Sequence, residues 1–574
     1  MHKDSASENR FKVLGIFVLI LSGFTIFKLF QVSVFEHQKY LTLAEDQQRF
    51  ESIDPAQRGR IYVYDSKEKD SLYPLAFDVK KYTILAVPRN IKKKDETSDK
   101  ISVIVGKTSQ EIFDQINNDK IYVPPIVKDL DYVTAMKIKD LKISGLYIVP
   151  EYSRYYPEKT LASQVLGFVN AEGKGNYGFE GHYDRELQGT SGKTTGEKDT
   201  LGRMISLLEQ KDAQDGTSYV LTIDRSTQYY VEKKLKEAID LHKADSGSVV
   251  IMDIKTGGIV AMASSPSFDP NNYKEFAANQ GVFMNPIISH LYEPGSVFKP
   301  ISMSAAIDAG TVTPETEGVF DWFTIVDGYQ ISTAEKKAFG KESMTQVLIN
   351  SDNVAMCWVA SQLGKDNLYK YINSFGFFDK TKIDLDTEQA GYSPLPLKQW
   401  KDINTANTSF GQGISVTPME LAAAYATIAN KGVYIYPHIV DKIIMPDGTE
   451  KKVEKQEGSR VIKEDTANKM VEMLSQVVEQ GHAKKAGVVG FRIGGKTGTA
   501  QIAENGVYLS AENALGIFNH TLAGFGPSDD PRFAMIVKLE KPKDAKYAET
   551  TAAPLFGDIA SYLLNFYYKL TPTS

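Results

Sequence analysis

The sequence predicts an α+β multidomain protein with a single N-terminal transmembrane helix. Three observations lead to this fold class. The chain of 574 residues is too long for one compact core. Its composition, with 42% hydrophobic and 24% charged residues, is that of ordinary globular domains. One long apolar run lies near the N-terminus, and strand and helix patterns follow one another along the rest of the chain.

The apolar run covers residues 13–35, which is long enough for one membrane crossing. Lys28 lies near one end of the run, where its side chain can reach the membrane surface. A cleaved signal peptide needs small residues after its apolar core, whereas this chain has Lys28, Leu29 and Phe30 there. We therefore expect an uncleaved anchor. Positive charges flank both ends of the run, so charge alone does not orient it.

Residues 36–215 contain no cluster of side chains typical of a catalytic site. Residues 36–54 have the pattern of a polar helical stalk that ends at Pro55. Short strand patterns at 61–64 and 82–87 alternate with polar connections. We interpret this region as a stalk followed by a non-catalytic domain of mixed α/β structure.

A second region, residues 216–574, begins after a change in the pattern of the chain. A helix is expected from Asp224, a candidate N-cap, to about Leu241, and another over 553–568. The strand patterns of this region lie at 219–223, 248–252, 259–263, 522–527 and 532–539. Strands at both ends of a region whose middle is helical imply one mixed sheet with helices on its faces.

Two Ser-x-x-Lys tetrads occur, and only one has a context suited to catalysis. Ser66 and Lys69 lie among charged residues of a solvated loop. Ser296 and Lys299 open an apolar helix pattern that stops at Gly310. Residues three apart at a helix start share one face, so the Ser296 hydroxyl and the Lys299 amine can meet. Lys299 can serve as the base only if a partly buried, electropositive pocket lowers its pKa toward about 7 to 8.

The tripeptide Ser351-Asp352-Asn353 lies between two helix patterns, so its side chains can project from a loop into a cleft. Ser351 can relay a proton between Lys299 and a leaving group. Asn353 can bond both a backbone amide and Lys299. The alternative interpretation is an ordinary helix N-cap, which is a common use of such a tripeptide.

The third motif is Lys496-Thr497-Gly498-Thr499, which two glycines precede. The glycines remove side chains from a strand, so that a substrate backbone can lie along its edge. Lys496 and the hydroxyls of Thr497 and Thr499 can then hold a terminal carboxylate. Backbone N–H groups of Ser296 and Thr499 can form an oxyanion hole.

Other chemistries find no support in the sequence. The eight histidines form no His-Glu-x-x-His or comparable grouping, so we expect no catalytic metal and no cofactor. A Gly-x-Ser-x-Gly elbow is also missing. The net charge of -6 offers no basic surface to nucleic acid. The single cysteine, Cys357, lies in an apolar run and is interpreted as a core thiol.

The three motifs, in this order, resemble those of penicillin-binding proteins and class A β-lactamases. Over nearly its whole length the chain resembles class B penicillin-binding proteins, with a likeness to the division type. Further stretches carry the resemblance, among them Arg58-Gly59-Arg60-Ile61, Arg154-Tyr155-Tyr156-Pro157, Gly178-Phe179-Glu180-Gly181 and Phe410-Gly411-Gln412-Gly413. The first three lie in the pedestal region, which secreted β-lactamases lack.

This resemblance implies a domain order and a location. Residues 1–12 would be a cytoplasmic tail, 13–35 the anchor and 36–215 a stalk with a dimerisation-type pedestal domain. Residues 216–574 would form a transpeptidase domain with an antiparallel sheet flanked by helices. The protein would cross the inner (plasma) membrane once and keep its catalytic domain outside the cytoplasm.

The resemblance also implies an activity, that of a peptidoglycan DD-transpeptidase. Ser296 would be acylated by the penultimate D-Ala of a stem peptide, the terminal D-Ala would leave, and a neighbouring stem-peptide amine would accept the acyl group. The implied partners are stem peptides, β-lactams, the lipid bilayer, a membrane glycan polymerase and other cell-wall synthesis proteins. Asp352 is not the commonest residue of this family at its position between Ser351 and Asn353. It adds a negative charge that could disturb the pKa of Lys299.

Proteins of the same fold offer three alternatives: a DD-carboxypeptidase or β-lactamase-type hydrolase, a β-lactam sensor, and a non-enzymatic scaffold of the division complex. A β-lactamase needs a deacylating base, and the sequence has no Glu-x-x-Leu-Asn pattern to supply one. The complete set of motif residues counts against a silent scaffold. The sequence does not separate division from elongation roles.

Overall fold

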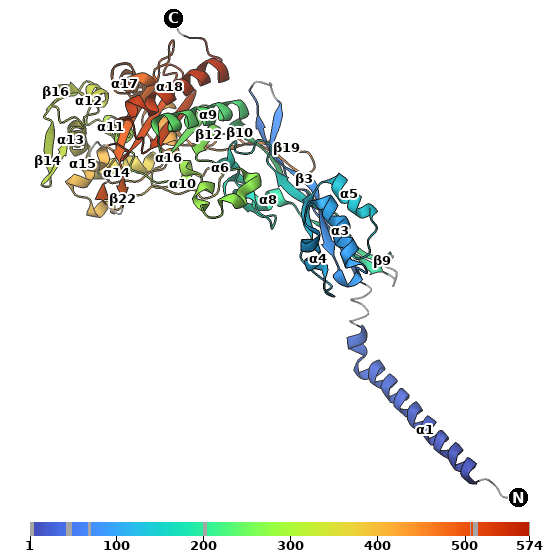
Figure 1. Ribbon diagram of the computed structural model, residues 1–574. Coiled ribbons are helices and arrows are strands. Elements are labelled where there is room, and N and C mark those ends of the chain that lie inside the picture. The colour runs from blue at the N-terminus through green and yellow to red at the C-terminus, as the bar shows by residue number, and fades with distance from the viewer. Residues whose placement is uncertain are drawn as a thin grey trace. The chain divides into compact units, whose positions relative to one another are not determined.

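The computed structural model describes residues 5–41, 49–66, 71–198, 204–504, 507–508 and 515–572. The chain divides into two compact units, of which the first contains Met1–Ala56 and Gly189–Asp215. The second unit contains Gln57–Gln188 and Gly216–Ser574. Figure 1 labels the elements of both units along the chain.

The first unit begins with one long apolar helix. Helix α1 (Ser5–Phe30) continues into a π-helical turn, Gln31–Phe35. Its segment Asn9–Phe35 is long and apolar enough to cross a membrane, and none of it is buried against protein. The exposed large side chains of this segment are therefore available to lipid. In Figure 1 it is the blue helix at the N-terminal end of the chain.

A three-stranded antiparallel sheet completes the first unit. Strand β8 (Gly192–Lys198) pairs with β1 (Arg49–Asp54) on one side and with β9 (Met204–Lys211) on the other. The predicted helical stalk is therefore wrong at its C-terminal end, although residues 37–41 are helical. Residues 42–48 lie outside the described residues. The strand partner of β1 is remote in sequence, and a local polar pattern carries no sign of such a partner.

The N-terminal part of the second unit is built on a seven-stranded sheet. Its strands follow the order β19-β18-β10-β2-β3-β4, and β5 also pairs with β3. Their bounds are β2 Ile61–Tyr64, β3 Leu72–Ala86, β4 Val127–Leu130, β5 Leu146–Tyr155, β10 Ser218–Asp224, β18 Val440–Ile444 and β19 Glu450–Lys452. Strand β10 runs parallel to β2 here. We had expected it in the sheet of the later strands, and that expectation is wrong.

Short helices cover this sheet and connect it to the rest of the unit. A cluster of buried isoleucines, among them Ile84, Ile101 and Ile112, packs helices against the long strand β3. The helices and short strands here are α3 Lys94–Val105, α4 Ser109–Ile116, α5 Tyr132–Asp140, α6 Ser163–Leu166, β6 Phe168–Val169, β7 Gly175–Asn176, α7 Gly178–His182 and α8 Asp184–Gln188.

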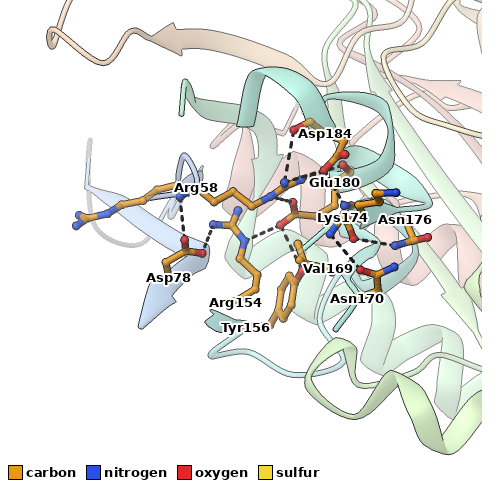
Figure 2. A network of polar contacts seen from close by, with 12 residues as sticks. Arg58, Asp78, Arg154, Tyr156, Val169, Asn170, Lys174, Asn176, Glu180 and Asp184 are labelled. Atoms are coloured by element: carbon orange, nitrogen blue, oxygen red, sulfur yellow. Dashed lines mark hydrogen bonds and ion pairs between the residues drawn. The ribbon is translucent and has the colours of Figure 1, made fainter. Parts of the chain in front are cut away.

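A buried network of charges ties the start of this unit to its helices (Figure 2). The carboxylate of Glu180 accepts hydrogen bonds from Arg58 Nε and Arg154 Nε, each at 2.7 Å. Arg58 also donates to Asp184 at 2.7 Å, and Arg154 to Asp78 at 3.3 Å. Burial by itself would raise the pKa of Glu180, but the two arginines outweigh it and hold that pKa below its ordinary value. Glu180 therefore stays ionised and needs both partners.

Removal of the Glu180 carboxylate should destabilise the second unit strongly. We expect Glu180→Ala to lower the free energy of unfolding by about 3 to 5 kcal/mol, because two buried arginines would lose their shared counter-charge. Chemical denaturation followed by fluorescence measures this change. The matched control is Glu96→Ala, which removes an exposed carboxylate that also bonds two cations, Lys93 and Lys100. Equal losses in the two variants would contradict the expectation.

The C-terminal part of the second unit contains a five-stranded sheet in the order β12-β11-β25-β24-β21. All four strand pairs are antiparallel, so the mixed sheet inferred from the strand patterns is corrected to the antiparallel one that the resemblance implied. The bounds are β11 Ser246–Asp253, β12 Ile259–Ser265, β21 Gly494–Gln501, β24 Phe518–Gly526 and β25 Phe533–Glu540. Strand β21 lies at one edge.

Nearly every residue of the central strands of this sheet is buried. Helices therefore cover both of its faces. Helix α9 (Arg225–His242) begins at the predicted N-cap, where Asp224 accepts the Thr227 N–H at 2.8 Å. It packs with α18 (Ala552–Tyr562), which continues as a π-helix to Tyr567. Helices α16 (Pro418–Ala429) and α17 (Glu464–Gln480) pack against each other and against the same sheet.

The remaining elements form the helical region and its small hairpins. The helices are α10 Pro286–Ser289, α11 Lys299–Asp308, α12 Met344–Asn350, α13 Asn353–Leu363, α14 Lys365–Ser374 and α15 Asp402–Ser409. The paired strands are β13 Glu317–Phe320 with β16 Gly340–Ser343, β14 Phe323–Val326 with β15 Tyr329–Ser332, β17 Val433–Ile435 with β20 Glu457–Arg460, and β22 Ala503–Glu504 with β23 Val507–Tyr508.

Candidate active site

Ser296 lies on a single 3-10 turn, Gly295–Phe298, that leads directly into α11. Its side chain is half-buried, whereas the rest of this turn is buried. Pro300 falls in the first turn of α11, where its missing N–H costs nothing. The helix ends at Asp308, and Gly310 adopts a positive φ of 77°. The helix start and the glycine stop expected from the sequence are both present.

The Lys299 side chain is completely buried, and its amine faces the loop between α12 and α13. The Nζ atom donates to the Ser351 carbonyl oxygen at 2.6 Å, to Asn353 Oδ1 at 2.7 Å and to Ser351 Oγ at 3.1 Å. Burial, followed by the charge of Lys496, holds the pKa of Lys299 well below its ordinary value. The amine is thus in the buried, electropositive setting that a lysine base requires.

The tripeptide at 351–353 both caps a helix and contacts Lys299. Ser351 has a positive φ of 57° and ends α12. Asp352 is the N-cap of α13 and accepts the N–H groups of Val354 and Ala355 at 2.6 and 3.1 Å. Asn353 donates from Nδ2 to a carbonyl oxygen of β15 at 3.1 Å, which orients its Oδ1 toward Lys299. The two interpretations of the tripeptide are therefore compatible.

The charge of Asp352 acts on the pKa of Lys299. This charge favours the ammonium form and raises the pKa of Lys299, but burial and Lys496 have the larger effect. The net shift of that pKa is downward.

Edge strand β21 carries the third motif along the side of the Ser296 turn. Lys496 is completely buried, burial lowers its pKa to about 7, and its Nζ donates to the Thr497 carbonyl at 3.2 Å. A Cβ on Gly498 would lie 3.0 Å from the Pro294 carbonyl oxygen, so a larger residue would crowd this close approach. Thr499 Oγ1 accepts the Ala548 N–H at 3.1 Å.

One cavity of about 270 Å³ brings most of the predicted site residues together. Ser296, Ser351, Asn353, Thr497 and Thr499 all line it. Lys299 lies behind this lining and is bonded to two of its members, and Lys496 lies behind it on the same strand as the threonines. The sequence did not single out several other lining residues, because no local motif marks them: Ala334, Glu335, Phe339, Asn350, His482, Phe518, Lys546, Tyr547, Ala548 and Glu549.

The other Ser-x-x-Lys tetrad has a different setting. Ser66 donates from its backbone N–H and from Oγ to the Asp224 carboxylate at 2.7 and 3.1 Å. Residues 67–70, which include Lys69, lie outside the described residues. In the part of the chain that the structure describes, no group of three or more His, Cys, Asp or Glu side chains could hold a metal ion.

Comparisons with known proteins agree with this geometry. Residues 247–561, more than half of the chain, match the penicillin binding protein transpeptidase domain family. The chain belongs to the class B penicillin-binding proteins. Residues 53–221 match the penicillin-binding protein dimerisation domain family. The resemblance seen in the sequence is confirmed, and this class B penicillin-binding protein is a peptidoglycan D,D-transpeptidase, a serine acyltransferase.

Curated relatives and a solved structure extend this result. Stage V sporulation protein D of Bacillus subtilis is 32% identical over 83% of this chain and 74% of its own length. Peptidoglycan D,D-transpeptidase FtsI of Escherichia coli is 33% identical over 74% of this chain and 69% of its own length. Penicillin binding protein 3 from Mycobacterium tuberculosis, solved in complex with aztreonam, has a TM-score of 0.70 and 27% identity, covering 91% of this chain and 98% of that one.

The family relationship also bears on ligands and on location. Class B penicillin-binding proteins bind stem peptides and β-lactams. The apolar N-terminal helix fits a single-pass membrane protein.

The Phe410–Gly413 segment supports the Ser296 turn from behind, and its glycines test this contact. Gly411 has a φ of 80°, and a Cβ there would lie 2.2 Å from the Gly295 carbonyl oxygen. Gly413 has a similar φ of 72°, but nothing lies within 4 Å of its Cβ position. We expect Gly411→Ala to slow acylation by fluorescent penicillin at least about tenfold, since the turn that carries Ser296 must move. Gly413→Ala is the control, because it adds only the strain of a positive φ, about 1 kcal/mol, and no steric clash. Equal acylation rates would contradict this role of Gly411.

Proposed function

We propose that Ser296 is the nucleophile of this transpeptidase and that Lys299 is its general base. One observation carries the proposal: the Lys299 amine is completely buried, hydrogen-bonded to Ser351 and Asn353, and has a strongly lowered pKa. A lysine with its ordinary pKa would be protonated at neutral pH and could not accept the proton of a serine. The environment of Lys299 removes this obstacle.

The hydrogen bonds of Lys299 suggest how its lone pair is directed. A neutral amine has two N–H groups and one lone pair. The two carbonyl oxygens, at 2.6 and 2.7 Å, are acceptors and would take the two N–H groups. The lone pair is then left for a hydroxyl that can donate, either Ser351 Oγ at 3.1 Å or Ser296 during attack.

In the acylation step, Ser296 Oγ attacks the carbonyl carbon of the penultimate D-Ala while its proton moves to Lys299 Nζ. Collapse of the tetrahedral intermediate breaks the peptide bond to the terminal D-Ala. The leaving amine receives the proton from Lys299 through Ser351, which lies between them in the same cavity lining. In the second step an acceptor amine of a neighbouring stem peptide attacks the ester carbon and passes its proton through Ser351 to Lys299. The bond between that carbon and Ser296 Oγ then breaks, and Lys299 returns a proton to Ser296.

The remaining predicted residues are proposed to bind the substrate. Lys496 and the hydroxyls of Thr497 and Thr499 would hold the terminal carboxylate, and the Thr499 hydroxyl keeps its proton for this purpose while Oγ1 accepts the Ala548 N–H. Gly498 leaves the edge of β21 open to the substrate backbone. The backbone N–H groups of Ser296 and Thr499 would stabilise the developing oxyanion.

The cellular arrangement is also part of the proposal. Residues 1–12 would lie in the cytoplasm, 13–35 would cross the inner membrane, and 36–215 would form the stalk and pedestal. The transpeptidase domain, 216–574, would work outside the cytoplasm on glycan strands. Supply of these strands calls for a membrane glycan polymerase and other cell-wall synthesis proteins as partners.

The role of Ser296 is tested by covalent labelling. We expect Ser296→Ala to abolish labelling of the full-length protein by fluorescent penicillin, because no acyl-enzyme can form without the hydroxyl. Gel fluorescence after denaturation measures the bound label. Ser66→Ala, which alters the first residue of the other tetrad, is the matched control and should label normally. Labelling that survives in Ser296→Ala would overturn the assignment.

The roles of the two lysines predict a bell-shaped pH profile. The rate constant for acylation of the free enzyme should rise as Lys299 loses its proton, well below the usual lysine range. It should fall above about pH 7 as Lys496 loses the charge that attracts the ligand carboxylate. In Lys496→Arg the guanidinium stays charged, so the alkaline fall should vanish even though the geometry lowers the rate. An alkaline fall that persists in this variant would contradict the role of Lys496.

A further inference from the structure

Two carboxyl groups lie buried together behind the amine of Lys299. Glu342 is in β16, which pairs with β13 and precedes α12, and it is 2% exposed. Asp352, the N-cap of α13, is 0% exposed. The chemistry proposed for Ser296 and Lys299 uses neither group directly, so their burial beside the site requires an explanation.

Each carboxyl group has one oxygen with donors and one without. Glu342 Oε1 accepts the Asn350 side-chain amide at 2.7 Å. Asp352 Oδ1 accepts the N–H groups of Val354 and Ala355. Within the described part of the chain, Glu342 Oε2 and Asp352 Oδ2 are buried without a hydrogen-bond donor. Buried carboxylate oxygens without donors are strongly disfavoured.

The two groups satisfy each other if one proton lies between them. Burial raises the pKa of Glu342 to about 7, and Asp352 acts in the same direction through its charge and a side-chain hydrogen bond, against the Asn350 amide. Two ionised carboxylates can only accept, so a hydrogen bond between them requires that one be protonated. Asn350 then tethers Glu342 Oε1 and leaves Oε2 to face Asp352.

We propose that Glu342 and Asp352 share one proton, so that a single negative charge lies behind Lys299, and that Glu342 is a positioning residue for the base. The proposal rests on the role of Lys299 proposed above. Glu342 touches no reacting atom and acts through Asp352, which stands between the two residues that hold the lysine amine.

The charges around Lys299 show why the number of protons on the pair matters. Burial and Lys496 lower the pKa of Lys299, whereas Asp352, Cys357 and Glu342 raise it. A second full negative charge on the pair would raise the pKa of Lys299 and so disfavour the neutral amine. The other charged residues of the β13–β16 strand pair, Lys341 and Glu317, bond to each other on its exposed face and do not compensate for this charge.

Ionisation of the pair is therefore coupled to protonation of Lys299. When the shared proton leaves, the added negative charge favours the ammonium form of Lys299. The carboxyl pair and Lys299 therefore titrate together, and neither has a pKa that is independent of the other. In the natural protein the rate constant for acylation should then rise gradually with pH, so the acid limb of the pH profile is broad. With one proton retained on the pair, the amine stays neutral over a wider range of pH.

Glu342→Gln tests the idea because it imitates a permanently protonated Glu342. Its carbonyl oxygen can accept from Asn350, and its amide can donate to Asp352 Oδ2. In full-length protein, the midpoint of the acid limb for acylation by fluorescent penicillin should move down by about one pH unit and the limb should sharpen. Glu317→Gln, which removes an exposed carboxylate from the partner strand β13, should leave the profile unchanged.

Glu342→Ala separates positioning from simple folding. It leaves Asp352 Oδ2 and the Asn350 amide without partners, so acylation should slow at least about tenfold at every pH, and Glu342→Gln should restore it. Two results in Glu342→Gln would overturn the proposal: a pH profile equal to that of the natural protein, or a loss of acylation rate as large as that of Glu342→Ala.

Infrared spectroscopy tests the shared proton without reference to catalysis. The difference spectrum between the natural protein and Glu342→Gln should contain the C=O band of a protonated carboxyl group, which disappears above about pH 7. Absence of that band would overturn the proposal. Failure of the proposed function would be seen separately, as penicillin labelling that survives in Ser296→Ala or an acid limb that survives in Lys299→Ala.

Discussion

The site depends on the burial of one amine. Removing the Lys299 ammonium from water is costly, so burial holds the pKa of this amine well below its ordinary value. The loop between α12 and α13 supplies two carbonyl acceptors at 2.6 and 2.7 Å, which suit a neutral amine as well as a charged one. Buried Lys496, on the neighbouring strand, adds repulsion that disfavours the charged form. In the proposed mechanism this amine is the base for Ser296, and no histidine is needed.

The same constraint accounts for the parts that surround the amine. Strand β21 must approach the Ser296 turn closely, which Gly498 allows. The turn must be held from behind, where Gly411 lies against the Gly295 backbone. Asp352 caps α13, so the helix that orients Asn353 begins beside the lysine. The negative charge of Asp352, together with Cys357 and Glu342, raises the pKa of Lys299, and the proton shared with Glu342 limits that effect.

Local patterns predicted much of the fold and the motif residues of the site, but not the other residues that line its cavity. Helix α9, the β11–β12 hairpin and the start of α11 follow from caps, glycines and periodicity that act over a few residues. Remote pairing was not visible in this way. Strand β10 joins β2, and residues 49–54 form a strand with β8, because a strand edge takes whatever partner the tertiary fold brings to it.

The sequence by itself determined which groups could carry the chemistry: Ser296, Lys299, Ser351, Asn353 and Lys496, recognised by their order and their flanks. Only the tertiary structure decided the state of those groups, because a pKa depends on burial and on charges that are distant along the chain. Glu342 illustrates this difference. No local motif marks Glu342 in the sequence. It becomes a neighbour of Asp352 only when strand β16 folds against the loop that binds Lys299.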